Sequence, residues 1–105
     1  MLVWTPAKVG EKLALSFTVT EDGDYGVLLA CMFRPDGGTF RATVDGDDVV
    51  FNGRESVNLV APHHVQSRVV SAQLQRLRAG KHALTLTALK THKPIGLDFV
   101  GFRKN

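Results

Sequence analysis

The stretch KLALSFTV, Lys12–Val19, alternates apolar and polar side chains one by one. Because successive side chains of a strand point to opposite faces, its leucines, phenylalanine and valine share one face, and its lysine and hydroxyl groups lie on the other. The stretch HALTLTALK, residues 82–90, repeats this alternation, whereas YGVLLACMF, residues 25–33, is apolar on both faces. A short run that is apolar throughout is typical of a central strand covered by two layers. Together these stretches predict an all-β fold.

Four sequences rich in glycine and charged residues separate the predicted strands. They are EDGDYG (Glu21–Gly26), RPDGG (Arg34–Gly38), VDGDD (Val44–Asp48) and RAGKH (Arg78–His82). Asp-Gly pairs favour hairpins, because both central positions of the preferred turn need a positive φ. Strands recurring roughly every 8–12 residues predict an antiparallel β-sandwich of about eight strands, which occupies residues 1–105 as one domain. Its predicted core residues are Leu13, Leu15, Phe17, Leu28, Leu84, Leu86, Leu97 and Phe99.

One segment has two interpretations. The stretch VVSAQLQRLRAG, residues 69–80, places Val70, Leu74 and Leu77 at helical spacing and ends on a glycine that could cap a helix. The turn sequences around it and the alternating stretch after it favour a strand with an irregularity. We expect the strand.

Size and composition are those of a single globular domain. The 105 residues are enough for one two-layer core, and an apolar fraction of 44% with a charged fraction of 22% is usual for such a protein. No apolar run approaches a membrane span and no signal peptide is apparent, so no membrane partner is expected and the location stays unknown. The one cysteine, Cys31, lies in an apolar run and is expected to be a buried thiol.

Charge is distributed unevenly along the chain. Residues 1–52 hold eight acids and four bases, whereas residues 53–105 hold two acids and nine bases. A basic half could meet nucleic acid or an acidic polymer. The bases are scattered between apolar residues, however, without the interleaved aromatics of a nucleic-acid site, so nucleic acid is not an expected partner.

Several stretches together resemble a known family. The order LVWTPAKVGEKLALSFTVTEDGDYGVLL, FRATVDGDDV, VNLVAP, LRAGKHALTLTAL and IGLDFVGF is similar to a galactose-binding-like jelly roll. It is most like the accessory modules beside bacterial glycoside hydrolases, and more distantly similar to family 6 and family 35 carbohydrate-binding modules. Its most specific pieces are Gly80–Leu86 and Leu97–Phe99. The resemblance implies a jelly roll with a carbohydrate ligand, secreted or periplasmic if it is part of a glycoside hydrolase.

Asp98 is an unexpected carboxylate in an apolar strand. It must be exposed, hydrogen-bonded or bound to a cation, because an unpaired buried carboxylate is very unfavourable. In the resembled modules, such an Asp can hold a structural calcium together with an N-terminal acid. The segment MLVWTPAKVG, residues 1–10, contains no acid, and calcium prefers six to eight oxygen ligands. We therefore expect no metal and no cofactor, and predict that Asp98 accepts hydrogen bonds near the N-terminal strand.

The candidate ligand-binding residues are aromatic, imidazole, amide and guanidinium side chains. Trp4 could stack on a sugar ring, or could pack over the edge of the sandwich instead. The loop APHH carries His63 and His64, which could contact hydroxyls, bind a transition metal, or form an ordinary polar loop. Hydrogen bonds to hydroxyls could also come from turn residues, where polar side chains are expected anyway: Arg34, Asn52, Arg54 and Asn58.

No catalytic constellation is apparent. The clustered carboxylates of EDGD and DGDD are explained by turn chemistry, and no nucleophile, zinc or phosphate-loop motif is present, so the chain is not expected to be an enzyme. The predicted function is non-catalytic carbohydrate recognition. The alternative is a structural or protein-interaction sandwich, such as a homodimer. Exposed aromatics around a groove would favour the first, and a flat apolar patch or a pairing edge strand the second.

Overall fold

The computed structural model describes residues 1–105, apart from the side chains of Gln66 and Leu74. Nine strands follow one another: β1 (Leu2–Trp4), β2 (Lys12–Val19), β3 (Gly23–Phe33), β4 (Thr39–Val44), β5 (Asp47–Val49), β6 (Val57–Asn58), β7 (Val65–Leu77), β8 (Gly80–Ala88) and β9 (Ile95–Lys104). No helix interrupts them in the backbone of these residues. The prediction of an all-β fold is confirmed.

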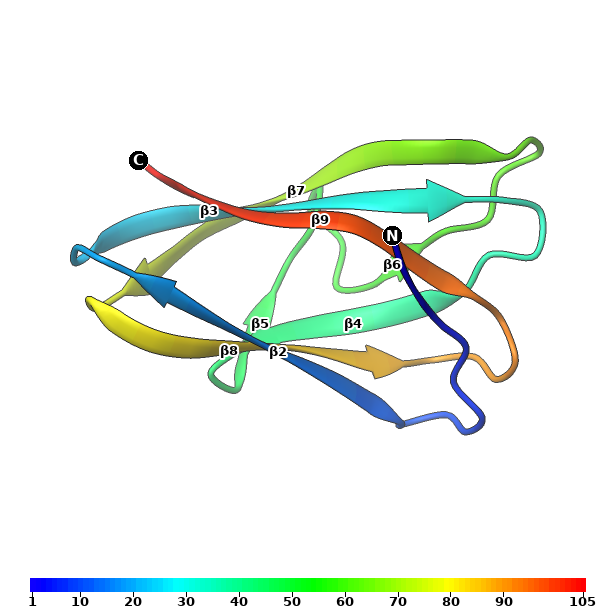
Figure 1. Cartoon of the computed structure of the whole chain (residues 1–105), viewed down its shortest axis with the longest axis horizontal. Coiled ribbons are helices and arrows are strands. Elements are labelled where there is room, and N and C mark those ends of the chain that lie inside the picture. Colours follow the sequence, from blue (N-terminus) through cyan, green and yellow to red (C-terminus); the bar gives the residue numbers. More distant parts are fainter.

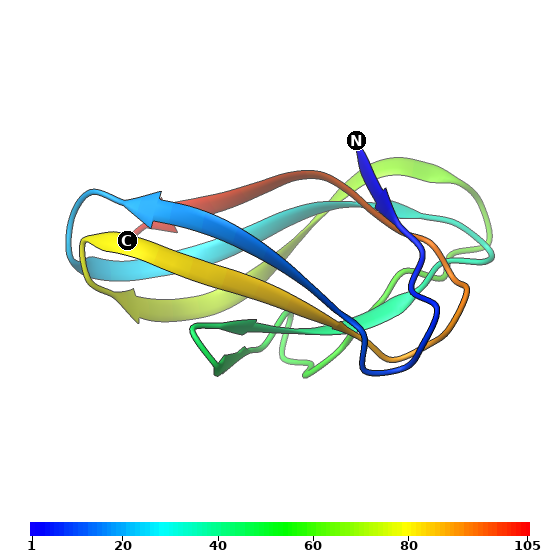
Figure 2. The same ribbon diagram turned by 60° about the horizontal axis from the view of Figure 1, so that its bottom comes forward.

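The strands form two antiparallel sheets that pack face to face. The first sheet has the order β1-β9-β3-β7, and the second has the order β2-β8-β4-β5 with β6 also paired to β4. Figure 1 shows β3, β7 and β9 in one layer and β2, β4 and β8 in the other, and Figure 2 shows the chain passing repeatedly between the layers. The β-sandwich is confirmed, with nine strands where about eight were expected.

The core lies between the sheets and fits the sequence prediction in part. Three predicted core residues are buried: Leu84, Leu86 and Leu97. Three more pack against the core from the edge strand β2 while staying partly exposed: Leu13, Leu15 and Phe17. Leu28 is partly exposed and lies outside the core, between the buried Val27 and Leu29, and Phe99 is half exposed. The predictions for Leu28 and Phe99 are therefore wrong. Cys31 is buried as expected, and its burial raises the pKa of the thiol to about 12.

A β-bulge at Asp98 explains the exposure of Phe99. Along β9, Phe99 pairs with Ala30 and Leu97 pairs with Cys31, so two neighbouring residues of β3 face three residues of β9. Asp98 is the extra residue. An extra residue in one strand resets the alternation of side chains beyond it. Leu97 therefore faces the core, and Phe99, two residues later, faces outward.

The same bulge corrects the expectation for Asp98 itself. Beyond it, Val100 and Phe102 pack against the core, which is why both faces of this strand look apolar in the sequence. Asp98 is exposed, and no hydrogen bond or ion pair joins it to another described side chain. The predicted hydrogen bonds are wrong, because a solvated carboxylate needs no protein partner.

The segment with two interpretations is a strand. Residues 69–77 belong to β7, whose pairing with β3 shifts register twice, between Tyr25 and Val27 and between Cys31 and Phe33. The expected irregular strand is confirmed and the helical alternative is wrong. The position of the Leu74 side chain, one of the three at helical spacing, lies outside the described part of the structure.

Only one of the four predicted hairpin turns joins paired strands. VDGDD connects β4 to β5, with Asp45 and Gly46 at φ 50° and 88°, the positive values that its turn requires. The sequences EDGDYG, RPDGG and RAGKH each carry the chain from one sheet to the other. Turn residues favour a chain reversal, but they do not determine whether the flanking strands pair with each other or lie in opposite layers.

Candidate functional site

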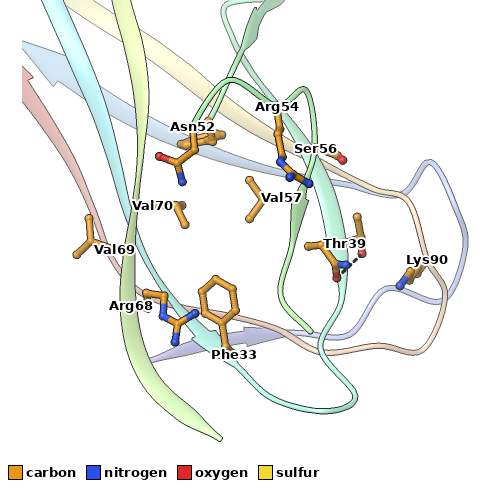
Figure 3. A pocket seen from close by; sticks show the side chains of 12 residues that line it. Phe33, Thr39, Asn52, Arg54, Ser56, Val57, Arg68, Val69, Val70 and Lys90 are labelled. Carbon is orange, nitrogen blue, oxygen red and sulfur yellow. Dashed lines mark hydrogen bonds between the residues drawn. The ribbon is translucent and has the colours of Figure 1, made fainter. Parts of the chain in front are cut away.

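An open groove of about 550 Å³ lies along the side of the sandwich, between β7 of the first sheet and β4 with β6 of the second (Figure 3). The chain lines it from segments far apart in the sequence. The lining residues are Phe33, Thr39, Phe51, Asn52, Arg54, Ser56, Val57, Asn58, Arg68, Val69, Val70 and Lys90. Val57 of β6 and Val70 of β7, both buried, form its apolar base, and most of the other lining residues carry hydrogen-bonding groups.

A tight turn forms one end of the groove. Phe51 and Arg54 exchange backbone hydrogen bonds of 3.0 and 2.8 Å across Asn52 and Gly53, whose φ values are 50° and 77°. Asn-Gly is the favoured pair for such a two-residue turn, because both positions tolerate a positive φ. The turn is fastened to β7, since the Asn52 N–H donates to the Ser71 carbonyl at 3.0 Å. It thereby bridges the two sheets and directs the side chains of Asn52 and Arg54 into the groove (Figure 3).

The pairing of β6 with β4 positions the side-chain amide of Asn58 on the side of the groove that the second sheet forms. The Asn58 Oδ1 accepts hydrogen bonds from the Thr39 hydroxyl at 3.3 Å and from the Val60 N–H at 3.2 Å. Because the oxygen is fully used within the protein, the amide NH₂ is left as a donor for the groove. The backbone N–H of Leu89 donates to the Thr39 carbonyl at 2.9 Å, which brings Lys90, the next residue, to the same side.

An arginine covers one of the two phenylalanines that line the groove, and the other, Phe51, is buried. The Arg68 guanidinium lies 4.8 Å from the centroid of the Phe33 ring, a distance typical of a cation–π contact. Phe33 itself is only 7% exposed, so its ring offers no open stacking surface. The lining therefore lacks the exposed aromatics that would favour carbohydrate recognition, and presents a guanidinium over its phenylalanine instead.

The lining is positively charged. Arg54, Arg68 and Lys90 come from three different segments, and no acid is among the lining residues. None of the three is in an ion pair within the described part of the chain, whereas arginines elsewhere pair with aspartates, such as Arg41 with Asp48 at 3.4 Å. The cations of the groove are thus available to a ligand.

The structure separates the predicted site residues into those of the groove and those outside it. Asn52, Arg54 and Asn58 line the groove. Trp4 lies on β1 and packs, partly buried, against the edge of the core. The remaining three also lie elsewhere: Arg34 forms an ion pair with Asp36, and the loop residues His63 and His64 are exposed.

Sequence reasoning missed Arg68 and Lys90. Both were interpreted as part of scattered, solvated positive charge, and nothing local to them indicates that they meet. The sequence does contain a signal for one end of the groove: the Asn-Gly pair at residues 52–53 predicts a tight turn and hence a fixed backbone position for Arg54.

A second polar cluster lies at the opposite end of the second sheet, around His82. Its Nδ1 contacts the Asp45 carboxylate, and its Nε2 lies 2.6 Å from the Arg78 carbonyl oxygen. Both partners are acceptors, so the arrangement suits an imidazolium that donates twice. The hydrogen bond with Asp45, followed by that with the Arg78 carbonyl, raises the pKa of His82. Hydrogen bonds from His82 and from the Ala83 N–H lower the pKa of Asp45.

The surroundings of His82 identify a structural role for this cluster. The imidazole stacks on Phe17 at 5.5 Å between centroids, and Phe17 stacks on Phe102 at 3.7 Å. The cluster therefore connects the β4–β5 turn to β8 by hydrogen bonds, and its imidazole packs on an aromatic contact between the two sheets. It lines neither the groove nor the shallow depression around Tyr25.

Few other functional features are found in the part of the chain that the structure describes. Among the described residues, no three histidine, cysteine, aspartate or glutamate side chains gather as a metal site would require. The part of the chain that the structure describes has no helix able to cross a membrane. In comparisons with known proteins, the sequence matches no family model and no curated protein.

Proposed function

We propose that the chain is a non-catalytic carbohydrate-binding module that uses the groove between β7 and β6. One observation carries the proposal: an open groove in which convergent polar side chains surround an apolar base formed by Val57 and Val70. Small-molecule sites in general combine apolar lining with a few placed polar groups. The resemblance to galactose-binding-like modules supports the same ligand class.

The groove suits modest affinity. Binding would rest on hydrogen bonds and on apolar contact with sugar C–H groups, because the Phe33 ring is covered by Arg68. An open site buries little ligand surface, and association has a large entropic cost. We expect a dissociation constant of about 10 µM to 1 mM, which corresponds to only about 4–7 kcal/mol.

A screen of plant, algal and bacterial glycans tests the proposal. The variant Asn52→Gly/Ser56→Ala removes two uncharged groups from the groove, and glycine keeps the positive φ that residue 52 needs. The matched control Ser16→Ala/Asn105→Gly makes the same changes at exposed positions outside it. We expect the groove variant to weaken glycan binding and the control to retain it, with both folded by their melting curves. Absence of binding across the whole panel would refute carbohydrate recognition.

The outer face of the first sheet supports a second candidate, self-association into a homodimer. Ala30 pairs with Phe99 on one side and with Val69 on the other, and all three belong to the face turned away from the second sheet. Val3 pairs with Gly96 on the same face, and Val3, Val69 and Phe99 are each about half exposed. A contiguous exposed apolar surface is typical of an interaction site.

Measuring the mass in solution over a range of concentrations distinguishes the second candidate. A homodimer predicts a mass that rises with concentration and a Phe99→Ser variant that stays monomeric. A mass that stays that of a monomer up to high concentration would exclude the homodimer. If glycan binding is also found, carbohydrate recognition remains as the one supported function.

A further inference from the structure

We infer that the groove takes an anionic saccharide, one that carries carboxylate or sulfate groups, rather than a neutral one. This inference rests on the proposed function and names its ligand class. Three cations that lack ion-pair partners among the described residues face one space, with no acid in its lining: Arg54, Arg68 and Lys90. Three unpaired positive charges around one groove repel one another, and an anion would relieve that repulsion.

The hydrogen-bonding character of the lining points the same way. Guanidinium and ammonium groups only donate, and the Asn58 amide has its oxygen used by Thr39 and Val60, which leaves its NH₂ as a donor. A sugar hydroxyl both donates and accepts, so a neutral sugar needs acceptors as well as donors. Carboxylates and sulfates only accept, so they match a lining built mainly of donors.

Before a ligand arrives, the side chain of one cation and the backbone of another are already fixed. The stacking of Arg68 on Phe33 at 4.8 Å restricts its side chain, and the planar guanidinium can present paired N–H groups to the two oxygens of an anion. Arg54 follows a turn fixed by backbone hydrogen bonds to Phe51 and, through Asn52, to β7. Figure 3 shows both side chains, with Lys90 on the other side of the same space. Such positioning lowers the entropic cost of binding.

Nucleic acid is the other polyanion that a basic groove could take. Single strands are bound by aromatic side chains that stack on the bases. Neither phenylalanine of the lining offers an open face, because Phe33 is covered by Arg68 and Phe51 is only 2% exposed. The observations therefore favour a saccharide.

Calorimetric titration with matched ligands tests the inference. The ligands are an oligogalacturonide, the same oligomer with its carboxyl groups reduced to neutral CH₂OH, a sulfated galactan oligosaccharide, and a thymidine oligonucleotide. We expect at least one anionic saccharide to bind about tenfold more tightly than the neutral oligomer, because hydrogen bonds to charged groups are the stronger ones. The comparison of carboxylate with sulfate identifies which group is recognised. The preference should shrink in 1 M salt, where the screening length falls to about 3 Å.

Charge-neutralising variants show whether the preference for anionic oligomers comes from the groove. Arg54→Gln/Arg68→Gln/Lys90→Gln should abolish the preference for the anionic oligomer. The control Lys12→Gln/Lys81→Gln/Arg103→Gln removes the same charge from exposed positions outside the groove and should keep the preference. Lys90→Gln alone changes only an exposed loop residue, and it should weaken anionic binding severalfold without affecting the fold.

The outcomes separate this inference from the function on which it rests. Equal binding of neutral and anionic oligomers, or an unchanged preference in the triple groove variant, would overturn the anionic ligand while leaving a carbohydrate site in place. Tightest binding to the oligonucleotide would overturn it in favour of nucleic acid. Binding of none of these saccharides, nor of any glycan in the panel, would remove the proposed function together with the inference.

Discussion

The two sheets of the sandwich differ on their outer faces. In the second sheet, Lys12, Ser16 and Thr18 of β2 are exposed between inward-facing neighbours, as expected of a sheet with one solvated face. In the first sheet, Phe99 and Val69 are half exposed on the outer side, and strand pairing is interrupted by bulges in β9 and β7. One sheet is therefore a regular scaffold, whereas the other carries the irregularities, an apolar outer surface and one side of the groove.

Truncating one large apolar side chain in each sheet gives the largest expected effect. Leu86 is completely buried in β8 of the second sheet, so Leu86→Ala should lower the free energy of unfolding by about 2–5 kcal/mol. Phe99→Ala removes a half-exposed ring from the first sheet and should cost less than half as much. Urea unfolding measures both. Equal losses would place Phe99 in the core and contradict the bulge.

Deleting the bulge residue should have a much smaller effect. Removal of Asp98 leaves Leu97 and Phe99 as neighbours opposite Cys31 and Ala30, so Val100 and Phe102 keep facing the core. The free energy of unfolding should therefore change by about 1 kcal/mol or less, and a loss as large as that of Leu86→Ala would contradict the bulge.

The matched control for this deletion is Asp98→Ala, which keeps the bulge. Since the carboxylate is exposed and has no described partner, this change should stay within about 0.5 kcal/mol. A melting temperature that falls by many degrees for the substitution would show that the carboxylate has a stabilising partner.

A pH effect of about 1 kcal/mol is expected from the His82–Asp45 pair of the second sheet, since Asp45 is partly solvated. The pKa of His82 is raised, so its contribution is complete below about pH 6.5 and is lost as the pH rises through the folded pKa. The pKa of Asp45 is lowered, so its contribution is present above about pH 3.9 and is lost at lower pH. The pair therefore stabilises most between these limits.

The variant Asp45→Asn isolates this pair, because asparagine also tolerates the φ of 50° at this position. Its deficit relative to the unchanged protein should be larger at pH 5.5 than at pH 9. A deficit that is the same at both pH values would mean that the ion pair contributes nothing beyond neutral hydrogen bonding.

The same contrast between the sheets explains which features could be predicted from the sequence. Period-two alternation locates Leu84 and Leu86 in the core of the second sheet, and Asp-Gly locates the β4–β5 hairpin, because both signals are local. A run that is apolar on both faces hides an extra residue, so the bulge at Asp98 left no signal in the pattern. The outward position of Phe99 could not be predicted for that reason.

The groove was harder to predict than the fold. Asn52 and Arg54 were among the candidate residues because of their chemistry. Arg68 of β7 and Lys90 of the loop after β8 meet them only through the packing of the sheets. The prediction that Trp4 stacks on a sugar ring rested on its residue type alone. The structure places Trp4 against the core edge, where its neighbours and not its chemistry determine its role.

The most direct test of the account is an amide chemical-shift titration of the ¹⁵N-labelled protein with the oligogalacturonide. If the groove is the binding site, the backbone amides around residues 52–58, 68–70 and 90 should shift together and saturate with one dissociation constant. The amides of β1 and of the loop carrying His63 and His64 should stay in place. Saturable shifts confined to Trp4, His63 or His64, or to the outer face around Phe99, with none in the groove, would contradict the account.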